Sequence, residues 1–463
     1  MLNFDYKSFS PFKKNFLIMS SGAFANFLIV FILTPVLTRI FSEEQFGVYY
    51  QYFSLATIIS TIILGTYPVA LVIPKLEREF LKLLKLVIAL SIIGTLTLQI
   101  VILIAGDKFM AATNTENIGE LIHLLPFSMF LICISQICNY SNIREALFKK
   151  NSSSMVVWSG SEKGSALLLS QILTPSAIGL VLANVVGNIA RIFTLLSFSL
   201  VKKMRNVFSI SNFEVFQKAR EFIKYPTRVL PSTLISTFTS DLPLYLLVGK
   251  FGIAAVGFFG MARNLLNISY NLIGQALAPV YFKEAASLYV NDKARLKELT
   301  KSIFFKLLVI SCLGFGLIFG FGDIIFKIFL GDEWLTAGKV AAIISVFYVF
   351  KIISSPFSNL FNVAHKEDQL LILQIVIAIC RILGIYIGIS TSHLLLAIAI
   401  YSFSSVIGYA FFLNSTFALL DINAIPLFIK SILIMAFIFG CFYLLRLLIS
   451  NWFSYFQYDL LTI

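Results

Sequence analysis

Four cations lie inside strongly apolar segments of the chain: Arg191, Arg263, Lys351 and Arg381. A charge at the centre of a membrane-spanning helix costs on the order of 2.5–3.5 kcal/mol, so four of them need partners or water. Guanidinium and ammonium groups bind phosphates and carboxylates through charge-assisted hydrogen bonds. For each cation alone, a structural ion pair or snorkelling to the interface is an equally good interpretation. As a group they predict a hydrated cavity of positive potential that binds an anion.

Side-chain amides accompany one of these cations. Asn264, Asn267, Asn271 and Gln275 follow Arg263 in the apolar stretch 257–284. At 100° per residue they fall on one face of a helix. Two interpretations stay open, because amides either hold helices together, at about 0.6–2 kcal/mol per hydrogen bond, or line a polar cavity. We take the four cations and these four amides together as candidate substrate-binding groups.

A second set of residues, Arg39, Arg228 and Asp241, consists of candidates for gating or ion coupling. Asp241 lies in the segment 225–247, which three prolines interrupt, and broken helices of this kind mark binding or gating regions in transporters. Asp241 either carries a coupling H+ or Na+ or pairs with Arg39, Arg228 or Lys250. Apart from such an ion, we expect no cofactor.

The composition predicts an all-α polytopic membrane protein. The chain has 463 residues, of which 58% are hydrophobic and 13% charged, and its mean hydropathy is +0.90. Apolar stretches of spanning length predict 12 to 14 transmembrane helices. The net charge of +13 comes mostly from Lys and Arg in alternate loops, on the side of the N-terminus. The positive-inside rule therefore places the N-terminus in the cytoplasm, and nucleic acid is not an expected partner.

Several kinds of chemistry find no support in the sequence. The five cysteines stand singly in apolar runs, without the CxxC spacing of a metal site, and the three histidines lie far apart. No Walker-type glycine loop for ATP is present. The acids recognised inside apolar segments are Glu162 and Asp241. We therefore expect a secondary transporter rather than an enzyme.

A weak internal duplication divides the chain. Gly47 aligns with Gly257, and "YSNIREALFKKN" from Tyr140 resembles "FSNLFNVAHKED" from Phe357. The expected parts are an N-terminal lobe of six helices (1–205), a cytoplasmic linker with an interfacial helix (206–225), a C-terminal lobe of six helices (226–420), and an additional helix with an aromatic tail (421–463). The two lobes would enclose a central cavity, as in transporters built from repeats.

The segment "SSGAFANFLIVFILTPVLTRIFSEEQFGVYYQYFSLATIISTIILGTYPVALVIPK", together with "GIAAVGFFGMARNLLNISYNLIGQALAPVYFKE", resembles bacterial polysaccharide flippases of the Wzx type. These belong to the superfamily of multidrug and toxin exporters and the lipid II flippase. The resemblance implies a cationic central cavity and a polyprenyl-pyrophosphate-linked oligosaccharide moved from the inner to the outer leaflet of the bacterial inner membrane. It further implies a role in O-antigen, capsule or lipopolysaccharide synthesis, with a polysaccharide polymerase and chain-length machinery as candidate partners.

Three alternatives remain. A multidrug or cation antiporter of the same superfamily would bind cations, for which a cavity rich in acids is expected. A lipid II flippase would carry the same headgroup charge. A membrane glycosyltransferase or polymerase would need acidic catalytic residues or a sizeable outer loop, and the outer loops of this chain are short.

Overall fold

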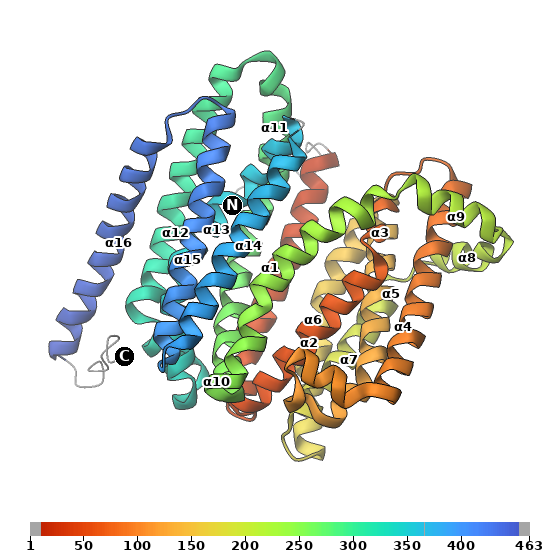
Figure 1. Ribbon diagram of the computed structural model, residues 1–463, viewed down its shortest axis with the longest axis horizontal. Helices are drawn as coiled ribbons and strands as arrows, with labels where there is room; N and C mark the ends of the chain where they lie inside the picture. Colours follow the sequence, from red (N-terminus) through yellow and green to blue (C-terminus); the bar gives the residue numbers. More distant parts are fainter. Residues whose placement is uncertain (1–10, 365, 453–463) are drawn as a thin grey trace, which may run out of the picture. The chain divides into compact units, whose positions relative to one another are not determined.

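The structure of the chain is a computed structural model that describes residues 11–364 and 366–452 (Figure 1). Within these residues every regular element is a helix, which confirms the predicted class. The longer helices of the first half are α1 (Pro11–Thr38), α2 (Glu43–Leu64), α4 (Glu77–Thr113), α5 (Leu125–Arg144), α6 (Phe148–Ile172) and α7 (Ala177–Leu195). Those of the second half are α10 (Leu230–Tyr270), α11 (Ala276–Asn291), α12 (Lys293–Leu330), α13 (Leu335–Val363), α14 (Glu367–Ser390), α15 (Leu394–Leu419) and α16 (Ala424–Trp452).

Short elements connect these helices. They are α3 (Tyr67–Ala70), α8 (Phe198–Asn206), α9 (Asn212–Glu221), the 3-10 turns η1 (Glu116–Leu124), η2 (Val207–Ser209) and η5 (Asp332–Trp334), and the π-helical turns η3 (Tyr225–Val229) and η4 (Asn271–Gln275). The turn η3 contains Pro226, which has no N–H to donate. A π-helical turn is rare and often marks a functional region.

Eleven helical stretches of the described chain are long and apolar enough to cross a membrane. One of them, 225–274, holds two spans because α10 is interrupted at Gly252. Helix α6 stands outside the eleven since its sequence carries Glu162, Lys163 and many serines. The second span of α10 and helix α6 bring the spans of the described chain to thirteen, within the predicted range of 12 to 14.

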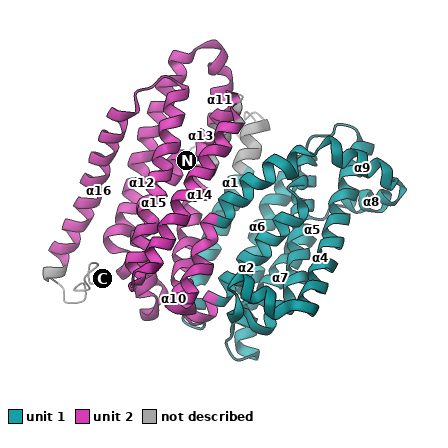
Figure 2. Cartoon of the chain, viewed as in Figure 1, with its two compact units in different colours: residues 1–41, 48–238 teal, residues 42–47, 239–463 magenta. Residues whose placement is uncertain are grey.

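The chain forms two compact units (Figure 2). Unit 1 comprises residues 1–41 and 48–238, and unit 2 comprises residues 42–47 and 239–463. The division falls inside α10 rather than at residue 226, where the sequence placed a boundary. Within unit 1, the Thr66 hydroxyl donates to the carbonyl of Tyr225, which lies in the turn η3 just before α10 (3.1 Å).

Helices that occupy equivalent places in the chain order pack together in each unit. In unit 1, α4 contacts α5, α5 contacts α7, and α6 contacts α7. In unit 2, α12 contacts α13, α13 contacts α15, and α14 contacts α15. This repetition of pairs agrees with the internal duplication of the sequence.

Two glycines of the repeat alignment meet in unit 2. A Cβ on Gly257 would lie 1.9 Å from the Glu43 carbonyl oxygen, and one on Gly47 would lie 2.3 Å from the Ile253 carbonyl oxygen. The start of α2 and the second arm of α10 therefore pack backbone against backbone. Only glycine permits this approach.

Helix α10 reverses its direction at Gly252, whose φ of 78° lies in the left-handed region. Arg263 follows Asp241 by 22 residues, which would separate their Cα atoms by about 33 Å in a straight helix. Their side chains nevertheless form an ion pair at 2.5 Å. The two residues are equally distant from Gly252, so the turn brings them face to face.

Helix α16 is attached to α12 by a buried ion pair. The Arg446 guanidinium donates to both carboxylate oxygens of Asp323, each at 2.7 Å, and one nitrogen also donates to the Gly320 carbonyl (2.9 Å). Phe442 packs directly on Gly316 and Gly320. Asp323 corrects the expectation that Glu162 and Asp241 are the acids inside apolar segments. The predicted aromatic tail lies largely outside the described residues.

Candidate functional site

Three of the four predicted cations, Arg263, Lys351 and Arg381, come together in unit 2 around one small cavity. Helices α10, α13, α14 and α15 supply its lining, which consists of Ser240, Phe259, Arg263, Ile344, Phe347, Tyr348, Lys351, Arg381 and Tyr401. The cavity has about 10 Å³, room for about one water molecule. The cations thus converge in a narrow space enclosed by aromatic rings.

Arg263 is the cation with a carboxylate partner. Its guanidinium lies 2.5 Å from Oδ1 of Asp241, which is only 4% exposed. The candidate partners of Asp241 in the sequence are Arg39, Arg228 and Lys250. The structure shows an ion pair with a further cation, Arg263, because the reversal at Gly252 places it opposite. Whether Asp241 also carries a coupling ion stays a prediction.

Lys351 is held by an amide and two aromatic rings. Its Nζ donates to Oδ1 of Asn267 at 3.0 Å, and it lies 4.5 Å from the ring centre of Tyr270 and 4.6 Å from that of Tyr348. The Tyr348 hydroxyl donates to the same Asn267 oxygen at 2.8 Å. Among the described residues, no carboxylate lies within ion-pair distance of Lys351. Its charge is therefore offset by dipoles and π faces rather than by an anion.

The Arg381 side chain on α14 forms hydrogen bonds with two neighbouring helices. It donates to Ser240 Oγ on α10 (2.9 Å) and to the Tyr409 hydroxyl on α15 (3.1 Å). The residue is 3% exposed, and its Nε has no hydrogen-bond partner within the described chain. A buried donor without a partner is costly, so this guanidinium retains the capacity to bind an acceptor.

The charges of this site do not balance. Three cations stand against the single carboxylate of Asp241 among the described residues that form the cluster. Such an excess within membrane-spanning helices attracts an anion, and guanidinium groups offer a phosphate paired, directional hydrogen bonds. The surrounding tyrosines add hydroxyl groups and ring faces. This arrangement can bind an anion through charge-assisted hydrogen bonds.

The four side-chain amides that follow Arg263 in the sequence do not all lie at the cation cluster. Asn267 accepts hydrogen bonds from Lys351 and Tyr348, whereas Asn264 is half-buried and Asn271 is exposed. None of the three is among the described residues that line the cavity itself. The turn η4 at Asn271–Gln275 is π-helical, so the assumed advance of 100° per residue fails there. The side chain of Gln275 lies outside the described residues. Roles in substrate binding stay predictions.

The remaining predicted residues belong to unit 1. Arg191 on α7 lies with its guanidinium 5.8 Å from the Trp158 ring, and its Nε has no hydrogen-bond partner in the described chain. Arg39 is exposed and donates to the Pro35 carbonyl (2.8 Å), and Arg228 is exposed. The substrate-binding role of Arg191 and the gating roles of Arg39 and Arg228 stay predictions.

Unit 1 also contains a buried polar network that was not predicted from the sequence. The Tyr49 hydroxyl donates to Oε1 of Glu162 at 2.5 Å, and the Asn184 amide donates to the same oxygen at 3.2 Å. Asn188 in turn donates to Oδ1 of Asn184 (2.8 Å). Asn184 thus binds the carboxylate of α6, and Asn188, one turn further along α7, supports Asn184. The signal was Glu162 itself, an acid within an apolar stretch.

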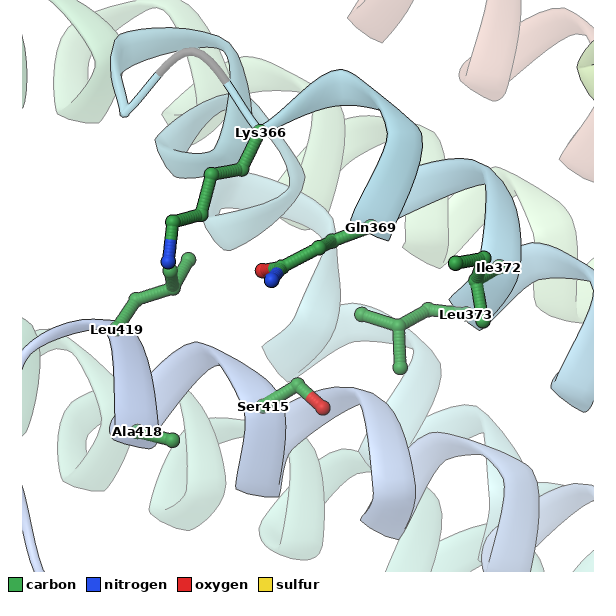
Figure 3. Close-up of a pocket in the computed structure, with 7 residues that line it drawn as sticks. All are labelled: Lys366, Gln369, Ile372, Leu373, Ser415, Ala418 and Leu419. Atoms are coloured by element: carbon green, nitrogen blue, oxygen red, sulfur yellow. The ribbon is translucent and has the colours of Figure 1, made fainter.

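A second pocket in unit 2 lies between the start of α14 and the end of α15 (Figure 3). It measures about 310 Å³. Lys366, Gln369 and Ser415 give it a polar side, while Ile372 and Leu373 extend it along apolar surface (Figure 3). It shares no lining residue with the cation cluster.

Comparison with known sequences decides the family. The profile of the family described as "Polysaccharide biosynthesis protein" matches residues 36–339, more than half of the chain. The chain belongs to this family. Its matched segment contains α2 to α12, with Asp241 and Arg263, and ends in α13 before Lys351. No curated protein sequence matches the chain significantly.

Solved structures show the same fold at low sequence identity. The family member resembles an inward-facing multidrug resistance MATE family transporter of the MOP superfamily, with a TM-score of 0.70, 14% identity, and coverage of 87% of this chain and 94% of that chain. It also resembles the lipid II flippase MurJ in an inward closed conformation (TM-score 0.69, 15% identity, 95% and 99% covered). A third similar structure is a MOP superfamily transporter from Pyrococcus furiosus, described as having a binding pocket of reverse polarity (TM-score 0.62, 14% identity, 91% and 98% covered). The chain therefore has the fold of MOP superfamily transporters.

Proposed function

We propose that the protein is a flippase that moves a polyprenyl-pyrophosphate-linked oligosaccharide from the inner to the outer leaflet by alternating access. The observation that carries this proposal is the convergence of Arg263, Lys351 and Arg381 on one cavity with a single carboxylate beside them. Membership of a polysaccharide biosynthesis family and the fold shared with a lipid II flippase support it.

A pyrophosphate needs countercharge and hydrogen-bond donors wherever it leaves water. Lys351 and Arg381 supply both without a carboxylate partner within the described chain, and Arg263 adds a third donor if Asp241 releases it. The tyrosine hydroxyls and amides nearby suit the hydroxyl groups of sugars. The cavity is narrow in this conformation, so binding of an oligosaccharide requires the site to open during the transport cycle.

The charge of the site argues against transport of organic cations. A cation antiporter would need an available carboxylate in its cavity, whereas the carboxylate of Asp241 already lies 2.5 Å from Arg263. The excess of positive charge repels a cationic drug and attracts a diphosphate. The shared fold with a MATE transporter therefore does not extend to its substrate class in this proposal.

The setting of the proposed transport follows from the sequence. The resemblance to polysaccharide flippases implies the bacterial inner membrane. The concentration of cations in the loops on the side of the N-terminus implies that this end is cytoplasmic. The exported unit would be a precursor of O-antigen, capsule or lipopolysaccharide, handed to a polysaccharide polymerase and its chain-length machinery. A coupling H+ or Na+ would use Asp241 only in a state in which Arg263 has moved away.

The test is transport of a labelled polyprenyl-pyrophosphate oligosaccharide by the purified protein in liposomes. Lys351→Ala is the most informative variant. Lys351 binds an amide oxygen rather than a carboxylate in the described chain, so its removal does not leave a buried acid unpaired. We expect at least about a tenfold loss of flipping, equivalent to about 1.4 kcal/mol of lost charge-assisted binding, with normal insertion and folding. Lys351→Arg should retain part of the activity.

A matched control removes charge elsewhere in the same unit. The double variant Arg446→Met with Asp323→Leu deletes a buried ion pair on α16 and α12, and neither residue lines the cation cavity. It should flip at the wild-type rate. Equal transport by Lys351→Ala and wild type would refute the proposed substrate site, and faster transport of lipid II than of the oligosaccharide would correct the substrate.

A further inference from the structure

Helix α9 (Asn212–Glu221) has its polarity reversed relative to a helix on the surface of a soluble protein. Its Lys218 is only 7% exposed, whereas Phe213 and Phe216 are 69% and 57% exposed. A soluble protein does the opposite, burying aromatic rings and solvating lysine. The face that α9 turns away from the rest of unit 1 is therefore the apolar one.

Ion pairs with α4 fix this orientation. Lys218 lies 2.7 Å from Glu79 on α4 and 2.7 Å from Glu221. Burial disfavours the charged form of Lys218, but the two carboxylates outweigh it and raise its pKa, so the ion pairs persist at neutral pH. Glu214 pairs with Arg78 of α4 at 2.9 Å. Figure 1 shows α8 and α9 beside the start of α4.

The outward face of α9 combines aromatic rings with positive charge. Phe213, Phe216 and Arg220 follow the i, i+3, i+7 spacing of one helix face, and the Arg220 guanidinium lies 4.8 Å from the Phe216 ring. Lys224 is exposed just beyond the helix, and on α8 Lys202 and Arg205 are exposed too. Of the two acids of α9, Glu214 is directed to α4 and Glu221 is bound to Lys218.

We propose that this face of α9 rests on a bilayer surface that contains anionic lipids, with Phe213 and Phe216 in the interfacial layer and Arg220 against lipid phosphates. An aromatic and cationic helix face beside the end of a membrane-spanning helix has the chemistry of an interfacial anchor. The polar face is already occupied by α4, so lipid rather than water meets the rings. This inference concerns the anchoring of the protein and is independent of the proposed substrate.

The experiment uses the full chain in nanodiscs of phosphatidylcholine alone or mixed with phosphatidylglycerol, both with brominated acyl chains. Phe213→Trp places a fluorophore on the outward face, and its emission is read as the difference from wild type. We expect quenching that grows with the phosphatidylglycerol fraction. In Phe213→Trp with Arg220→Gln, the fraction needed for half-maximal quenching should rise about fivefold, because one cation near the surface is lost.

Two outcomes would overturn the proposal. Emission typical of water, with no quenching in either nanodisc, would place the face in solvent. Blue-shifted emission without quenching would place it against protein. Both substitutions lie on the exposed side of α9, so melting temperatures equal to wild type are expected and exclude misfolding as the cause.

Discussion

Asp241 and Arg263 lie on the two arms of α10 and form an ion pair at 2.5 Å across the reversal at Gly252. The pair joins the arms of the helix and at the same time neutralises one of the three cations around the cavity. It therefore has a structural and a functional consequence, which substitutions can separate.

Asp241→Asn alone and Arg263→Gln alone should each destabilise the protein, by about 3–5 kcal/mol at most, because each leaves a largely buried charge without its partner. The double substitution should recover most of this stability while flipping stays low, since the donor from Arg263 is gone. Thermal unfolding in detergent and liposome flipping measure the two effects. Wild-type flipping by the double variant would show that Arg263 has no part in transport.

Outward flipping of a diphosphate should respond to the membrane potential. With the interior negative, two charges crossing the whole field gain about 4.6 kcal/mol per 100 mV, at about 2.3 per charge. Liposomes with a valinomycin-clamped potassium gradient allow both signs of potential to be imposed. Interior-negative potential should favour the outer leaflet, and a monophosphate-linked substrate should respond about half as strongly. A distribution that ignores the potential would contradict this coupling.

The ion pair between Arg446 and Asp323 should anchor α16. Arg446→Met leaves the buried carboxylate of Asp323 uncompensated and should cost about 3–5 kcal/mol. Adding Asp323→Leu should restore most of the loss, because an apolar pair of similar volume often replaces a buried ion pair. A double-mutant cycle from unfolding curves gives the coupling energy. Simple additivity of the two substitutions would contradict the paired arrangement.

Gly257→Val should disrupt the contact between the start of α2 and the second arm of α10. Its Cβ would lie 1.9 Å from the Glu43 carbonyl, a backbone atom that cannot turn aside, so we expect a loss of at least about 1–3 kcal/mol. Gly314→Ala on α12 is the matched control, because its Cβ meets no atom of the described chain within 4 Å. The control should be neutral or slightly stabilising. Equal melting temperatures for Gly257→Val and wild type would refute the contact.

The sequence predicted the helical class and the spans because hydropathy is a local property, summed over about 20 neighbouring residues. It also singled out Arg263, Lys351 and Arg381, which the structure brings to one cavity, since a charge within an apolar segment stands out wherever the helix packs. Arg191 was singled out by the same signal and lies in unit 1. The repeat alignment paired Gly47 with Gly257, and the two glycines meet in unit 2. Two buried acids were predicted incompletely from the sequence. Asp323 was not recognised, and Glu162 was recognised without its partners Tyr49 and Asn184.

Only the tertiary structure decided which charge meets which. Asp241 forms an ion pair with Arg263 because Gly252, a single residue with left-handed backbone, folds α10 back on itself. Hydropathy along the sequence does not predict the backbone angle of that residue. Lys351 and Arg381 share a cavity since α13 and α14 both contribute to its lining, and they come without a carboxylate of their own in the described chain. The types of residue are local properties, whereas their partners depend on backbone reversals and helix packing between residues far apart in the chain.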